Sequence, residues 1–171
     1  MLPDHVPFLD DLFSQLEAHT GALSHLFLDH LCYRVERVAR YETLRDKLRQ
    51  RGHELLAESI IGGRRISTFK LLTPLPYRDR LIPLLELPEP KPGSFYAEGY
   101  EHVEFVTDRP LAAFVDLLPS LLAPSVTTID LKGMAKSRNA DVRVKLERGY
   151  SVKFHERSLE EVIAEELEAR S

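Results

Sequence analysis

The chain has 171 residues, of which 43% are hydrophobic and 29% are charged, as is common for a globular protein. This length fits one domain, or two small modules that share an interface. The formal net charge of −4 argues against general nucleic-acid binding, and no apolar run approaches the roughly 20 residues of a membrane span. The first residues do not resemble a signal peptide, and Cys32 is the single cysteine. We therefore expect a protein of the reducing cytoplasm.

Hydrophobic periodicity and turn signals predict the elements of the first half. Leu9, Leu12 and Leu16 recur at helical spacing, which predicts an amphipathic helix over about 5–20. The elements expected after it are a strand over about 28–35, a helix over 40–51 and strands over 53–60, 64–72 and 80–88. Gly62-Gly63 and the segment from Pro74 to Asp79 are the expected turns. The order after the first helix is therefore βαβββ.

The second half repeats this order after a linker rich in proline and glycine. The expected elements are a strand over about 101–107, a helix over 110–122 and strands over 125–131, 140–146 and 150–155. Pro119 should break or kink the helix near its end. Ser158-Leu159-Glu160-Glu161 is a capping-box pattern, which predicts the start of a terminal helix.

The repeated order predicts an α+β fold of paired βαβββ modules that form curved mixed sheets around a cavity, with extra N- and C-terminal helices. His30 and His102 are separated by nearly as many residues as Glu86 and His155, which agrees with a duplication. We expect one domain over 1–171, with its parts at 1–24 (N-terminal helix), 25–90 (first module), 91–99 (linker), 100–157 (second module) and 158–171 (C-terminal helix). The modules could pair within a monomer or swap between the chains of a homodimer.

Strand alternation predicts which side chains share the face away from the helices. Successive side chains point to opposite faces, and the apolar set should pack on the helices. The residues left for the concave face are His30, Cys32, Arg34, His102, Glu104, Ser151, Lys153 and His155. Glu86 ends a strand with apolar neighbours on both sides, where a carboxylate is costly unless it is paired, hydrogen-bonded or bound to a metal.

These positions predict a site for a divalent transition metal. Three imidazoles, from His30, His102 and His155, with the Glu86 carboxylate make a suitable ligand set for Zn, Ni, Co, Mn or Fe(II). No short motif such as His-x-x-x-His supports the site, so the prediction depends on the duplication. Glu86 could instead form a buried ion pair with Arg34 or Lys153. Glu104 is the candidate acid or base, with an orienting role toward a histidine or a plain salt bridge as alternatives.

Several stretches resemble one known family. They are Asp29-His30-Leu31, Gly63-Arg64, Phe69-Lys70-Leu71, Glu86-Leu87-Pro88, Gly99-Tyr100-Glu101-His102, Lys153-Phe154-His155, Ser158 and Glu160-Glu161. Together they span nearly the whole chain, which resembles the YecM-like family of the vicinal oxygen chelate superfamily. That superfamily includes glyoxalase I, extradiol dioxygenases and bleomycin-resistance proteins. The resemblance implies paired βαβββ modules and the ligands His30, Glu86, His102 and His155. Many members have a glutamate as the last ligand; Glu156 is adjacent here, and strand parity favours His155.

The leading expectation is a metal-dependent isomerase, lyase or dioxygenase that binds two oxygens of a small substrate and stabilises an enolate or oxyanion. Arg34 and Lys153, and with unsettled parity Lys70, Arg143 and Lys145, would favour an anionic substrate. A solvated outer face of the strands would explain the same cations. Two other functions fit the sequence: a non-catalytic protein that sequesters a small molecule in the same cavity, and a relic of the fold whose His/Glu network holds no metal.

Overall fold

The computed structural model describes residues 1–126 and 128–169, and the chain divides into two compact units. The first unit comprises Met1–Asp4 and His30–Glu101, and the second comprises His5–Asp29 and His102–Ser171. Among the described helices, none combines the length and the apolar character needed to cross a membrane.

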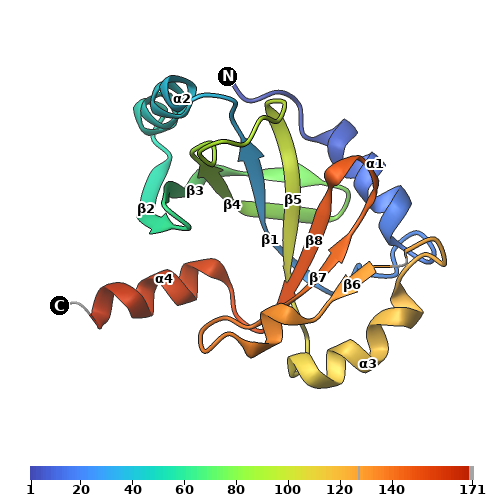
Figure 1. The fold of residues 1–171 in the computed structure, drawn as a ribbon. Coiled ribbons are helices and arrows are strands. Elements are labelled where there is room, and N and C mark those ends of the chain that lie inside the picture. The colour runs from blue at the N-terminus through green and yellow to red at the C-terminus, as the bar shows by residue number, and fades with distance from the viewer. Residues whose placement is uncertain (127, 170–171) are drawn as a thin grey trace. The chain divides into compact units, whose positions relative to one another are not determined.

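The first unit is a βαβββ module with a mixed four-stranded sheet (Figure 1). Its elements are β1 (Phe27–Arg34, which enters the unit at His30), α2 (Val38–Gln50), β2 (Glu54–Ile61), β3 (Arg64–Tyr77) and β4 (Arg80–Pro88). The strand order is β2-β3-β4-β1. β1 runs parallel to β4, whereas the β2–β3 and β3–β4 pairs are antiparallel.

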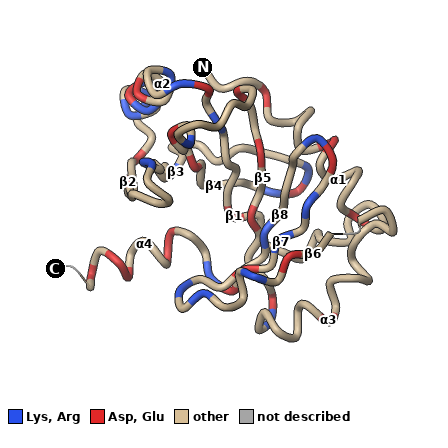
Figure 2. Tube along the Cα trace, in the orientation of Figure 1, with Lys and Arg blue, Asp and Glu red and all other residues tan. Residues whose placement is uncertain are grey.

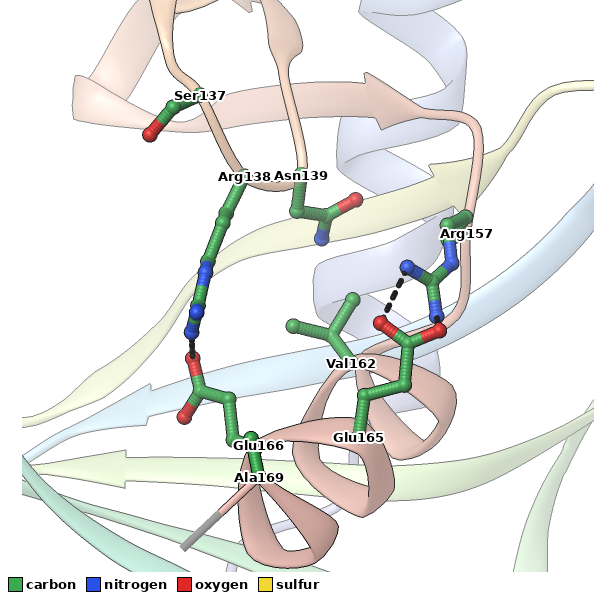
Figure 3. Close-up of a pocket in the computed structure, with 8 residues that line it drawn as sticks. All are labelled: Ser137, Arg138, Asn139, Arg157, Val162, Glu165, Glu166 and Ala169. Carbon is green, nitrogen blue, oxygen red and sulfur yellow. Dashed lines mark hydrogen bonds and ion pairs between the residues drawn. The ribbon is translucent and has the colours of Figure 1, made fainter.

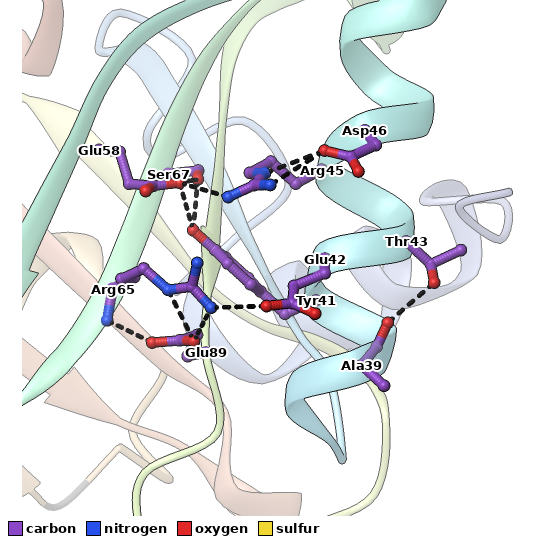
Figure 4. A network of polar contacts seen from close by, with 10 residues as sticks. All are labelled: Ala39, Tyr41, Glu42, Thr43, Arg45, Asp46, Glu58, Arg65, Ser67 and Glu89. Atoms are coloured by element: carbon purple, nitrogen blue, oxygen red, sulfur yellow. Dashed lines mark hydrogen bonds and ion pairs between the residues drawn. The ribbon is translucent and has the colours of Figure 1, made fainter.

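Polar contacts at the Tyr41 side of α2 join that helix to the sheet of the first unit (Figure 4). The buried Tyr41 hydroxyl lies 2.6 Å from Ser67 Oγ and donates to Glu58 at 2.9 Å. Arg65 donates to Glu89 at 2.8 Å, and its guanidinium lies 4.9 Å from the centre of the Tyr41 ring. A carboxylate, a guanidinium and an aromatic ring therefore hold the helix in place together with the buried leucines of α2.

The second unit has the same order of elements, with a helix added at each end (Figure 1). Its elements are α1 (Val6–Leu16), β5 (Gly99–Val106, which enters the unit at His102), α3 (Leu111–Leu121), β6 (Thr128–Asp130), the 3-10 turn η1 (Lys132–Ala135), β7 (Asp141–Lys145), the 3-10 turn η2 (Glu147–Gly149), β8 (Ser151–His155) and α4 (Leu159–Glu168). The strand order is β5-β8-β7-β6, with β5 and β8 parallel and the other pairs antiparallel.

Aromatic rings fill the interface between this second sheet and its helices. Phe105 of β5 stacks on Phe154 of β8 at 5.5 Å and meets the ring of Phe13 from α1 edge-on at 6.0 Å. Phe114 of α3 lies 5.0 Å from Phe154. Because side chains alternate along a strand, covering this face with α1 and α3 leaves the opposite face of β5 for Glu104.

The structure confirms the expected α+β fold, the repeated βαβββ order and the extra terminal helices. The turn expected over Pro74 to Asp79 is shorter than predicted: β3 continues through Pro74 and Pro76 to Tyr77, and only Arg78 and Asp79 form the turn before β4. A shift of the β3–β4 register between Lys70 and Leu75 accommodates the prolines, since proline is tolerated at irregular points of a sheet.

The last predicted elements differ from the structure only at their ends. Pro119 lies inside α3, which ends two residues later. The strand expected over 125–131 is reduced to β6, and residue 127 of that range lies outside the described residues, as do 170–171 of the expected terminal helix. The capping box of α4 is confirmed, because the Ser158 hydroxyl accepts from the Glu161 amide at 3.2 Å.

Candidate metal centre

Two of the predicted ligands meet in the first unit. The parallel register of β1 and β4 sets His30 opposite Leu84 and Cys32 opposite Glu86, so His30 and Glu86 share one face of the sheet. His30 Nε2 lies 3.8 Å from Glu86 Oε2, and only 1% of the histidine side chain is exposed. The strand pairing therefore brings an imidazole and a carboxylate from opposite ends of the βαβββ module to one place.

The other two predicted ligands surround Glu104 in the second unit. Glu104 Oε1 lies 3.4 Å from His102 Nε2, and Glu104 Oε2 lies 3.3 Å from His155 Nε2. The Lys153 ammonium, directly across the β5–β8 pair, forms an ion pair with the same carboxylate. Glu104 is thus buried between two imidazoles, and one lysine balances its charge.

The contacts of the two His155 ring nitrogens determine which of them could bind a metal ion. The ring is fully buried, and its Nδ1 contacts the carbonyl oxygen of Arg157. A carbonyl oxygen only accepts, so Nδ1 donates to it and Nε2 is the ring nitrogen that faces the Glu104 carboxylate. The contact with the carbonyl fixes the orientation of the ring, as is common for histidines that bind metal ions.

The distances within each unit suit a small metal ion. Two ligands bound at about 2.1 Å with tetrahedral angles lie about 3.4 Å apart. The pair of His30 and Glu86, at 3.8 Å, is slightly wider than that value. Glu104 lies 3.4 and 3.3 Å from the two predicted ligands of the second unit, where it can orient their rings. Buried imidazoles with a carboxylate are the donors that Zn, Ni, Co and Fe(II) favour. The donor atoms present therefore fit a divalent transition metal.

Two acidic residues that adjoin the predicted histidines bind helix starts instead. Glu156 Oε1 accepts from the Leu111 amide at 2.6 Å, at the beginning of α3. Asp29 Oδ2 accepts from the Leu159 amide at 3.0 Å, at the beginning of α4. A carboxylate at a helix N-terminus satisfies an otherwise unbonded amide. Sequence reasoning missed both roles, since the helix start that each residue serves is distant in the chain.

The structure also places the residues expected to bind a substrate, whose roles stay predictions. Arg34 pairs with Glu101, and its guanidinium lies 4.5 Å from the centre of the Tyr96 ring. Lys70 lies opposite Leu84 in the row that contains His30, so it is on the His30 face of the first sheet. Lys153, in the second unit, is the partner of Glu104. Cys32, two residues after His30 in β1, is buried.

A hollow of about 460 Å³ between α4 and the 137–139 segment of the second unit contains none of the predicted site residues (Figure 3). Its two arginines face acidic residues of α4: Arg138 lies 3.6 Å from Glu166, and Arg157 donates to Glu165 at 2.8 Å. Its charges are therefore paired within the protein, which makes it a weaker candidate for a binding site.

The sequence and the fold of this chain are similar to those of one protein family. A family model described as "YecM protein" matches residues 1–166. Protein YecM of Escherichia coli (strain K12) is 32% identical over 176 residues, which cover 98% of this chain and 92% of that protein. A solved structural-genomics protein, EC4020, has a TM-score of 0.76 and 31% identity, covering 96% of this chain and 88% of its own. The hypothetical protein BH1468 from Bacillus halodurans C-125 shares the fold alone. Its TM-score is 0.51 and its identity 16%, over 78% of this chain and 96% of its own.

Proposed function

The chain belongs to the YecM family, and from that premise we propose that it is a metal-dependent enzyme of the vicinal oxygen chelate type. Its ligands would be His30 and Glu86 from the first unit and His102 and His155 from the second. The ion would be Zn, Ni, Co, Mn or Fe(II), and the substrate a small anionic molecule with two neighbouring oxygens. The observation that carries the proposal is the buried His155 ring, which lies between the Arg157 carbonyl and the Glu104 carboxylate.

Two ligands from each unit are needed because a transition-metal site takes three or four protein donors. His30 and Glu86 lie on the first and last strands of the first module, as His102 and His155 do in the second, although the registers differ. Glu86 lies opposite Cys32, two residues after His30, whereas His155 lies opposite Val106, four residues after His102. We propose that both pairs bind one ion within a single domain over 1–171. When bound, the ion would polarise two substrate oxygens and stabilise negative charge that develops on them.

Side chains of the protein would transfer the proton that leaves the carbon next to the substrate oxygens. Glu104 is proposed as the acid or base, because its oxygens lie beside both imidazoles and Lys153 compensates its charge. A buried carboxylate positioned in this way can take a proton from carbon next to the substrate oxygens and return it. Lys153 would hold Glu104 in place, and Arg34 and Lys70 would contact the anionic substrate.

Metal analysis of the untagged protein tests the proposal. The wild type would be incubated with Zn, Ni, Co, Mn and, without oxygen, Fe(II), then desalted and assayed by mass spectrometry of the metals. We expect about one ion per chain, and a loss of about 100-fold in affinity for His30→Gln and for His102→Gln. His19→Ala, at an exposed histidine outside the site, should bind like the wild type.

Circular dichroism would confirm that each variant is folded. A wild type that stays metal-free with all five ions contradicts the proposal and favours a structural His/Glu network that holds no metal. Metal binding without turnover of any oxygenated acid would favour the alternative, a protein that sequesters its ligand.

A further inference from the structure

A row of charged side chains crosses the sheet of the second unit from Glu104 to the edge strand. Glu104 lies opposite Lys153 in the β5–β8 pair, and Lys153 lies opposite Arg143 in the β7–β8 pair. Arg143 in turn lies opposite Asp130 of β6. Directly opposite residues in paired strands point to the same face of a sheet. The four residues therefore share the face that carries His102 and His155.

A pocket of about 220 Å³ lies at the far end of this row. It is lined by Asp130, Lys132, Gly133, Lys136, Asp141 and Arg143. The turn η1 forms one wall, and it can approach β7 because Gly133 has no side chain: a Cβ there would lie 2.4 Å from the Asp141 carbonyl oxygen. Basic positions recur along this part of the chain, from Lys132 to Lys145 (Figure 2).

The acidic residues of this pocket are already neutralised within the protein. The buried Asp141 forms an ion pair with Lys136. Asp130 Oδ1 accepts from the Lys132 amide at 3.0 Å, and its Oδ2 lies 3.8 Å from the Lys145 ammonium. That backbone hydrogen bond, followed by the nearby cations, lowers the pKa of Asp130, so the carboxylate is ionised at neutral pH.

Two cations of the pocket remain available to a ligand. Among the described residues, neither the Lys132 ammonium nor the partly buried Arg143 guanidinium has an ion-pair partner within 4.0 Å. The pocket is therefore positive overall, although the chain carries a net charge of −4. A guanidinium in a concave, partly buried position can bind a carboxylate or a phosphate through two parallel hydrogen bonds.

We propose that this pocket binds an oxyanion, a carboxylate or phosphate group at one end of the substrate, with Arg143 as the anchor and Lys132 as the second cation. The placement of the other end of the substrate beside Glu104 rests on the proposed function. One strand separates β7 from β5, so the backbones at Arg143 and Glu104 lie about 10 Å apart. The substrate class is thus an elongated acid whose anionic end is held apart from its reacting oxygens.

Calorimetric titration of the metal-free 171-residue chain tests the pocket, with inorganic phosphate and with glutarate as probes at low ionic strength. We expect saturable binding of one oxyanion per chain, weakened about tenfold or more by Arg143→Gln. The matched control is Arg49→Gln, which removes the same charge from the exposed surface of α2 and should leave affinity unchanged. The amide signals of Lys132, Gly133 and Asp141 should shift on titration.

Absence of saturable binding of both probes by the wild type, or equal affinity of the two arginine variants, overturns the inference. The inference is also overturned if Arg143→Gln keeps its affinity for the oxyanion and the amide signals that shift belong to residues outside this pocket. Because no metal is present in this titration, its failure would leave the metal analysis untouched, and a failed metal analysis would leave the oxyanion pocket standing.

Discussion

The two units have the same order of elements but are held together by different interactions. In the first, polar contacts among Tyr41, Arg65 and Glu89 join α2 to the sheet. In the second, the rings of Phe105 and Phe154 pack against two helices. The repeat has therefore preserved the path of the backbone and the strand pairing, while the means of holding a helix on the sheet has changed.

The polar faces of the sheets differ as well. The first unit brings together one histidine and one carboxylate, His30 and Glu86, whereas the second surrounds Glu104 with two histidines and a lysine. Under the proposed function, the first unit would supply ligands only, and the second would supply ligands together with the proton-transferring group.

The largest expected effect is on the aromatic interface of the second unit. Phe105→Ala should lower the free energy of unfolding by about 3–5 kcal/mol, because it leaves a cavity between β5, α1 and β8. Urea denaturation followed by circular dichroism measures the change. Phe95→Ala removes a ring that is 101% exposed and should change stability by less than about 0.5 kcal/mol. Similar losses in the two variants would contradict the packing account.

The carboxylates of the two units provide the second comparison. Glu104→Gln should lower metal affinity by about tenfold, as expected of a neighbour that orients the histidines, and Glu86→Gln, as a ligand, should exceed the roughly 100-fold upper end of that range. Competition with a chelator of known affinity measures both. A greater loss in Glu104→Gln would show that this carboxylate is itself a ligand and would contradict its role as acid or base.

The terminal helix of the second unit has no counterpart in the first, and its cap can be tested alone. Ser158→Ala should cost about 1 kcal/mol of stability, because the Glu161 amide loses its acceptor. Urea denaturation again measures the change. Ser14→Ala, at an exposed serine inside α1, serves as the control and should have little effect. Equal losses in the two serine variants would argue against a specific capping effect.

The smallest effect concerns the polar network of the first unit in acid. The Arg65 side chain lowers the pKa of Glu89 below its ordinary value of 4.5 through hydrogen bonds. The pair therefore contributes stability above pH 4.5, and this contribution is lost as the pH falls through the lowered pKa. Arg65→Met should cost below about 1 kcal/mol at pH 7, since the guanidinium is partly exposed, and should flatten the fall of stability below pH 4.5. An unchanged slope would show that other carboxylates govern this acid sensitivity.

The sequence predicted the repeated order and the face of each strand because alternation is a local property. Phe105 and Glu104 are adjacent, and their opposite environments follow from their apolar and charged side chains. The sheet face to which Lys70 and Arg143 point could not be predicted from alternation alone. It follows from the pairing with the neighbouring strand, and that register is set by residues far along the chain.

Other features of the molecule lay beyond local patterns. Pro74 and Pro76 predicted a turn, but a register irregularity lets them stay in β3. The helix starts bound by Asp29 and Glu156 could be recognised only once the fold had brought distant segments together. The ligand roles of the four predicted residues stay predictions that the metal analysis will decide.

His155, the last residue of β8, and Glu156, which follows it, have different duties on opposite sides of the chain. The imidazole faces Glu104, and the carboxylate binds the start of α3. Inserting one residue within β8 would exchange them, presenting the carboxylate to the histidine side and leaving the helix amide without its acceptor. We therefore expect insertions and deletions within this strand to survive in evolution only in pairs of residues, which preserve both faces at once.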